Sequence, residues 1–105
     1  MNKKAKPQFI AENRLVLQLY VSGMSPKSME AIENIKRLCD EHLKDAFELE
    51  IIDIYKNPEA AMEQHVVFSP SLIKKFPQPK KILIGTLADS EKVIKALGFS
   101  FKQNG

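Results

Sequence analysis

The residues of this chain that could do chemistry gather at two turns, and neither turn holds a complete reactive set. Ser22-Gly23-Met24-Ser25 lies between an apolar run and a helix start, a position where disulfide-exchange proteins place a reactive pair of cysteines. As nucleophiles, Ser22 and Ser25 would need a general base, and none stands at a meaningful spacing. In the second turn, Ser69-Pro70-Ser71, the proline has two interpretations, a cis bond or an ordinary trans turn. Serines in place of cysteines favour binding over catalysis.

The other candidates for chemistry are Cys39, His42 and His65. Cys39 is the single cysteine and falls on the apolar face of a helix, so we expect a small core residue rather than a reactive thiol. The two histidines lie far apart, without the cysteine or carboxylate spacing that is typical of a metal site. The sequence therefore predicts no catalytic residue, no metal and no cofactor.

The first half of the chain must hold the first turn between a strand and a helix. Leu15–Val21 is apolar on both faces except at Gln18, which predicts a central strand of an α/β sheet. Ser25 caps a helix that begins at Pro26, and the run Phe47–Ile54 predicts a second strand, parallel to the first. We expect the helix to bury one face, made by Met29, Ile32, Ile35, Leu38, Cys39, His42 and Leu43, with Glu33 and Arg37 paired outside.

The second half predicts a short helix, two strands and a last helix. Asn57-Pro58 opens a helix through Met62, and the two prolines of Phe76-Pro77-Gln78-Pro79 predict a turn. A strand follows at Ile82–Gly85, and Asp89 caps a helix over Ser90–Leu97 that Gly98 ends. The order βαβαββα predicts one thioredoxin-like α/β domain over residues 14–98, with a flexible arm at 1–13 and a tail at 99–105.

Composition and charge narrow the classes of partner. A chain of 105 residues with 28% charged residues and one cysteine fits a single domain in a reducing cytoplasm, and no apolar run is long enough to span a membrane. Formal charge is divided into blocks, with +4 over residues 1–29, −6 over 30–63 and +5 over 64–105. This division favours self-association or an acidic protein partner. The bases form no stripe with stacking aromatics, which argues against nucleic acid.

Several motifs in fixed register resemble the KaiB family of circadian clock proteins. They cover about residues 14–97 and comprise LYVSGMSP at 19–26, IDIYKNP at 52–58, FSPSL at 68–72, PQPKKILIG at 77–85 and SEKV at 90–93. The chain has Gly85-Thr86-Leu87 where the family has Gly-Asp-Leu, which fits a divergent member.

The resemblance implies a non-enzymatic protein that binds KaiC, a hexameric RecA-type ATPase, and modulates its phosphorylation cycle in circadian timing or stress adaptation. It implies partner-binding lysines at Lys56, Lys74, Lys80 and Lys81. Taken alone, the basic residues around the double-proline turn are better explained as a solvated face, and the matching basic positions of the family favour docking. It also implies two folds, a thioredoxin-like monomer and a ground state, usually tetrameric, with the order βαββααβ. Pro70, Gly85 and Thr86 would then take part in the switch between them.

Two alternatives remain open at this point. One is a thioredoxin-like oxidoreductase, against which the missing cysteine pair argues. The other is a free-standing domain similar to the KaiB-like sensor of a histidine kinase, which would make a histidine kinase a second class of partner beside the chain itself as dimer or tetramer.

Overall fold

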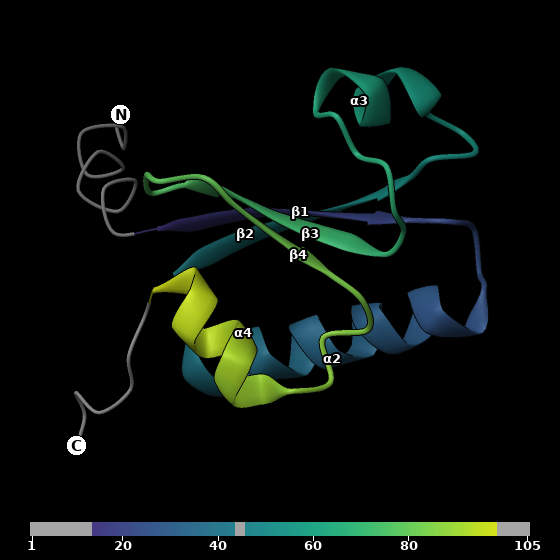
Figure 1. Ribbon diagram of the computed structural model, residues 1–105. Coiled ribbons are helices and arrows are strands. Elements are labelled where there is room, and N and C mark those ends of the chain that lie inside the picture. The colour runs from purple at the N-terminus through teal and green to yellow at the C-terminus, as the bar shows by residue number, and fades with distance from the viewer. Residues whose placement is uncertain (1–13, 44–45, 99–105) are drawn as a thin grey trace, which may run out of the picture.

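A four-stranded sheet with helices on both faces forms the protein in a computed structural model, which describes residues 14–43 and 46–98 (Figure 1). The expected arm at 1–13 and tail at 99–105 lie outside these described residues. The elements confirm the βαβαββα order and are β1 (Leu15–Val21), α2 (Pro26–His42), β2 (Phe47–Asp53), α3 (Pro58–Glu63), β3 (Ser71–Phe76), β4 (Lys81–Ile84) and α4 (Ser90–Leu97).

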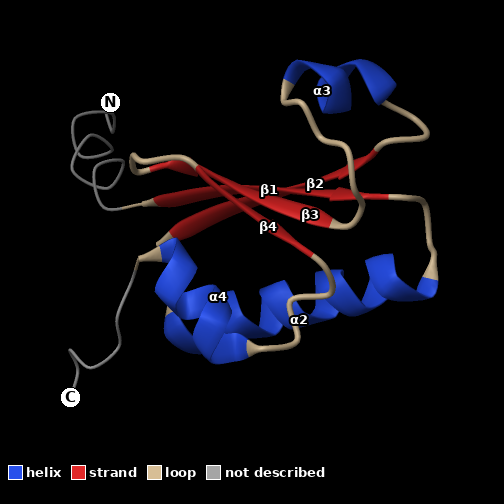
Figure 2. Ribbon diagram, in the orientation of Figure 1, coloured by secondary structure: helices blue, strands red, loops and turns tan. Residues whose placement is uncertain are grey.

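The strands lie in the order β2-β1-β3-β4, so the strand that is apolar on both faces is central, as predicted. β1 runs parallel to β2 because α2 carries the chain back across the sheet, whereas β1–β3 and β3–β4 are antiparallel. In Figure 2, α2 and α4 lie on one face of the sheet and the shorter α3 on the other. The two outer strands are β2 and β4.

The main core lies between the sheet and the two helices α2 and α4. It joins alternate residues of β1, such as Leu17 and Leu19, to Ile35 of α2 and Val93 of α4. A second, smaller cluster fills the space under α3 and contains Tyr20, Ile52, Ala61 and Ile73. Because successive side chains of a strand point to opposite faces, β1 contributes to both clusters.

Helix α2 departs from the expected buried face at its first turn. Ser28 is fully buried there, and its main-chain N donates to Ser25 Oγ at 3.3 Å in the predicted cap. The expectation that Met29 is buried is wrong, since 42% of this residue is exposed, and His42 is exposed as well. A small hydroxyl residue faces the sheet at this end because it bonds the preceding turn. Arg37 donates to Asn34 rather than pairing with Glu33.

The ends of the other helices and strands agree with the local sequence signals, with small differences. Asp89 accepts a bond from Lys92 N at 3.3 Å, and Gly98 ends α4 in a left-handed conformation. Asn57 precedes α3 but makes no side-chain cap bond. β4 begins one residue earlier than predicted and stops before Gly85, whose φ of +117° interrupts the strand.

Candidate functional site

The two turns singled out from the sequence lie side by side. Ser22 Oγ donates a hydrogen bond to Ser69 Oγ at 2.8 Å, and Ser69 Oγ in turn donates to the main-chain oxygen of Tyr20 at 3.5 Å. The Ser69–Pro70 peptide next to this contact is cis. The structure therefore brings together the positions at which a disulfide-exchange site would be built, with hydroxyl groups in place of thiols.

The serines of the first turn are held in a local network. Ser28 Oγ accepts from Ser22 N at 3.0 Å and from Ser25 Oγ at 2.8 Å. From β2, Asp53 Oδ1 accepts from Gly23 N and from Tyr55 N, both at 3.0 Å. The partners of these groups are other hydroxyls, main-chain groups and one carboxylate that caps two turns. Such a network fixes the turn but supplies no general base to activate a hydroxyl.

Cys39 lies in the main core, as expected, where it is fully buried. Burial, with a smaller contribution from the charge of Asp40, raises the pKa of its thiol from 9.0 to about 12. Because the thiolate is the nucleophilic form, this cysteine is unreactive at neutral pH. Among the described residues, no group of three or more histidines, cysteines and carboxylates could hold a metal ion.

The predicted switch residues come together at the end of β4. Gly85 N donates to Pro70 O at 2.9 Å, and this bond joins the end of β4 to the turn that precedes β3. The next residue, Thr86, accepts a bond on its main-chain oxygen from Asn34 Nδ2 of α2 at 2.8 Å. Leu87 follows with a φ of +63°. The joint between β4 and α4 is thus held from the sheet and from α2, and its backbone takes conformations that L-residues rarely adopt.

The expectation that Lys74 belongs to an exposed basic patch is wrong in this arrangement. Only 4% of the residue is exposed, because its side chain lies on the sheet face that α2 and α4 cover. Its Nζ comes close to Gly98, at the C-terminal end of α4, where the helix dipole favours a positive charge. Burial, followed by repulsion from Lys81, lowers the pKa of Lys74.

The other predicted lysines are exposed and border α3 and β4. Lys56 lies in the turn before α3, and Lys80 donates to Gln64 Oε1, just after α3, at 3.1 Å. Lys81 is the first residue of β4 and lies opposite Lys74 of β3 in the antiparallel register. Lys80 and Lys81 point to opposite faces of the sheet because they are consecutive in an extended segment. Lys80 and Lys81 therefore lie together at the end of the sheet where β1 begins, whereas Lys56 follows β2 at the end where β1 stops.

Exposed apolar residues near these lysines were not predicted as functional. Tyr55, Met62, Val67 and Phe68 are exposed on the α3 side, together with Ile82 and Ile84 of β4. The sequence features that could have identified these residues are the apolar run 66–68 and the two isoleucines of an edge strand. The sequence alone did not identify which strand would be outermost.

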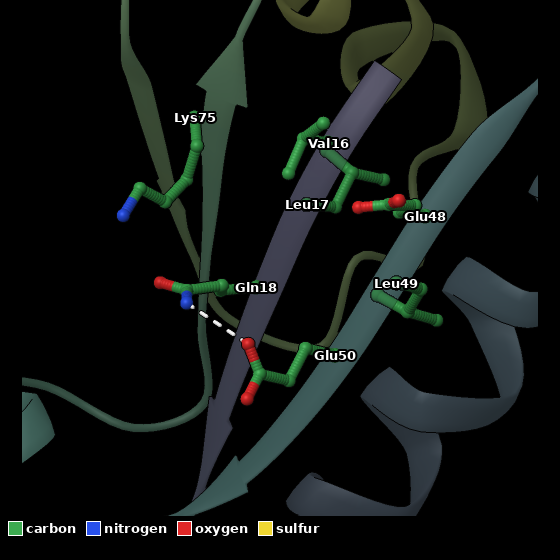
Figure 3. A pocket seen from close by; sticks show the side chains of 7 residues that line it. All are labelled: Val16, Leu17, Gln18, Glu48, Leu49, Glu50 and Lys75. Atoms are coloured by element: carbon green, nitrogen blue, oxygen red, sulfur yellow. Dashed lines mark hydrogen bonds between the residues drawn. The ribbon is translucent and has the colours of Figure 1, made fainter. Parts of the chain in front are cut away.

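A separate hollow of about 360 Å³ lies on the α3 side of the sheet, over β2, β1 and β3 (Figure 3). Gln18 Nε2 donates to Glu50 Oε1 there at 3.1 Å, and Lys75 lines the opposite wall. Glu48, which lies on the same strand as Glu50, forms an ion pair with Arg14, with 3.9 Å between the Arg14 Nε and the Glu48 Oε2. Because the hollow is open and its charges are mixed, it indicates no particular ligand.

Among the helices that the structure describes, none has the length and apolar character that a membrane span requires.

Comparison with known proteins agrees with the motifs. The family model described as the KaiB domain matches residues 18–99. The chain is 44% identical over 85 residues to the circadian clock protein KaiB3 of a Synechocystis species, covering 81% of this chain and 83% of that protein. It is 36% identical over 88 residues to the circadian clock oscillator protein KaiB of Microcystis aeruginosa, covering 84% and 85% of the two chains.

Solved structures establish the fold. The N-terminal domain of SasA from Synechococcus elongatus superposes with a TM-score of 0.67 at 24% identity, covering 81% of this chain and 84% of that one. A thioredoxin from Fasciola hepatica gives a TM-score of 0.67 at 18% identity, with 88% of each chain covered. The thioredoxin-like fold is confirmed, and the family match over most of the length shows that this chain belongs to the KaiB family of circadian clock proteins.

Proposed function

We propose that this protein is a non-enzymatic clock-type regulator that binds a KaiC-type RecA-family ATPase in the cytoplasm and modulates its phosphorylation and ATPase cycle. The domain that does so spans residues 14–98. The role is circadian timing or adaptation to stress. The family assignment supports the class of partner, and the observation that carries the docking site is an exposed surface that combines basic and apolar side chains.

The absence of redox chemistry at the paired turns supports a binding role. Ser22 and Ser69 bond each other where a disulfide-exchange site needs thiols, and Cys39 is buried with a raised pKa. A thioredoxin fold of this kind retains a rigid turn without its nucleophile. The oxidoreductase alternative therefore receives no support from the geometry.

The docking surface is proposed to contain Lys56, Lys80 and Lys81. These lysines are exposed, and residues 64–88 contain no aspartate or glutamate that would neutralise the last two. Exposed Met62 and Phe68 lie in the same region of the chain and supply apolar contact area. A basic rim around apolar residues suits an acidic partner surface, since charge complementarity steers association and apolar burial stabilises the complex.

A second arrangement of the C-terminal half, with the order βαββααβ and self-association into dimers or tetramers, is part of the proposal. Pro70, Gly85 and Thr86 meet at the joint that would have to move. Two packings of one sequence coexist when they differ by only a few kcal/mol. Sedimentation at micromolar concentration tests this part, because a monomer at every concentration would remove the oligomeric ground state.

The docking proposal is tested by reversing two charges. We expect Lys80→Glu with Lys81→Glu to abolish binding of the cognate KaiC-type ATPase in calorimetry, because like charges at a partly desolvated contact cost several kcal/mol. The matched control is Lys27→Glu with Lys36→Glu, which changes the net charge equally at exposed positions of α2. Full binding by the folded Lys80/Lys81 variant, or equal loss in both variants, would contradict a docking role for these lysines.

A further inference from the structure

The two outer strands of the sheet differ in how they are protected. On the α3 side of the sheet, β2 presents Glu48 and Glu50, and charged residues are a common means of keeping an edge strand from pairing with another chain. On the same side β4 presents Ile82 and Ile84, which are 48% and 62% exposed. The β4 edge therefore lacks the protection that β2 has along its length.

The unpaired main-chain groups of β4 belong to these two isoleucines. Gly85 N bonds Pro70 O, and the β3–β4 register continues this pairing through Leu83 with Leu72. In an antiparallel pair, hydrogen-bonded residues alternate with residues whose N–H and C=O groups point away. The main-chain groups of Ile82 and Ile84 consequently point to the free edge, away from β3.

Hollows flank this edge on both faces of the sheet. One of about 150 Å³ on the α3 side is lined by Val67, Phe68 and the two isoleucines. The other, of about 410 Å³, lies toward α4 and is lined by residues that include Leu83, Leu87 and Lys92. Alternate side chains of a strand added to β4 would enter the two hollows in turn, because a strand has a period of two. Main-chain pairing with side-chain pockets on each face is how sheet edges recognise extended peptides.

Charge at the edge selects the kind of segment. Lys80 and Lys81 are exposed at the start of β4 and point to opposite faces, while no acid occurs from Gln64 to Ala88. The nearest acid after β4 is Asp89, and its carboxylate caps α4. An antiparallel strand would place its C-terminal end beside the two lysines, where carboxylates would be favoured.

We propose that β4 is a docking edge for an extended segment of another protein, which carries apolar side chains at alternate positions and acidic residues at its C-terminal end. The segment pairs antiparallel with Ile82 and Ile84 and seats its apolar side chains in the hollow on the α3 side. This proposal does not depend on the identity of the ATPase partner, although Lys80, Lys81 and Phe68 belong to both proposed surfaces.

The test uses a synthetic peptide of alternating valine and threonine that ends in two aspartates, with blocked termini. Titration into the full chain is expected to shift the amide resonances of Ile82 and Ile84 more than those of β2. Ile82→Lys with Ile84→Lys should weaken binding at least about tenfold, since it removes both apolar contacts and protects the edge with charge. Met24→Lys with Met29→Lys, which adds the same charge at exposed positions outside the strand and its hollows, should retain the shifts at Ile82 and Ile84.

Two variants of the peptide keep the test independent of the folding of any protein variant. N-methylation of the alternate amides that face β4 should abolish binding, because it removes main-chain donors without changing the side chains. Exchanging the aspartates for lysines should weaken binding. Equal binding of the N-methylated peptide, or shifts confined to β2, would overturn the proposal. Shifts of Ile82 and Ile84 on diluting the protein alone would also overturn it, in favour of a second copy as the occupant.

Discussion

Asn34 Nδ2 of α2 donates a hydrogen bond of 2.8 Å to the main-chain oxygen of Thr86, a residue that lies 52 positions further along the chain. Arg37 donates to Asn34 Oδ1 at 2.9 Å and so orients the amide with its nitrogen toward Thr86. This contact ties the long helix of the first half to the joint between β4 and α4. It is a specific constraint on the arrangement of the last quarter of the chain.

Replacing Asn34 should loosen α4. We expect Asn34→Ala to lower the free energy of unfolding by about 1 kcal/mol, the usual net contribution of a partly buried hydrogen bond. Where α4 opens on its own, its amides should exchange about fivefold faster with deuterium, as that free energy implies. Lys36→Ala, at an exposed position of the same helix, is the control and should change stability by less than about 0.5 kcal/mol. Identical exchange of α4 in both variants would contradict the role of Asn34.

A side chain at Gly85 should strain the backbone of this fold. Its φ of +117° is a conformation that L-residues rarely adopt, although nothing lies within 4 Å of a Cβ added there. Gly85→Ala is therefore expected to destabilise the protein by about 1–3 kcal/mol through backbone strain alone. Urea unfolding measures the loss, and Thr86→Ala is the neighbouring control because Thr86 has no positive φ. Equal stability of Gly85→Ala and the unmodified protein would show that the joint relaxes freely.

The stability of the protein should fall at alkaline pH because of Cys39. Burial raises the pKa of the thiol on folding from 9.0 to about 12, so its contribution is fully present below pH 9 and is lost as the pH rises toward 12. Cys39→Ala removes this titration. We expect the stability gap between the two proteins to narrow progressively above pH 9, measured by urea unfolding at each pH. A gap that stays constant through this range would mean that the thiol ionises as readily in the folded protein.

Lys74 should be irrelevant to partner binding in the thioredoxin-like arrangement. Its side chain is buried against the side of the sheet covered by α4, so Lys74→Met removes a charge that a partner cannot reach. We expect affinity for the proposed KaiC-type ATPase partner to change less than about twofold, whereas we expect the Lys80/Lys81 charge reversal to abolish binding. Calorimetry on all three proteins makes the comparison. Strong loss with Lys74→Met would show that the bound state exposes Lys74.

Local signals in the sequence determined the elements that carry the site. Ser25 with Pro26, and Asp89 with Gly98, mark helix ends because caps depend on residues within one turn. The unbroken apolar run of β1 placed it inside the sheet, since a strand buried on both faces needs no polar side. The serines in the first turn already argued against disulfide exchange, because a thiol cannot be supplied from elsewhere in a chain whose single cysteine lies in a helix.

Only the tertiary structure decided which of the candidate residues are accessible. Lys74 and Lys80 have the same side chain and lie near the same double-proline turn, yet one is buried and the other exposed. That difference depends on α4 covering the sheet face to which Lys74 points, with the Lys74 Nζ near Gly98 at the end of α4, an arrangement that no local pattern specifies. The same holds for Ile82 and Ile84, whose alternation is identical in a central strand and an edge strand. The order of strands, which long-range pairing sets, left β4 outermost and its isoleucines exposed.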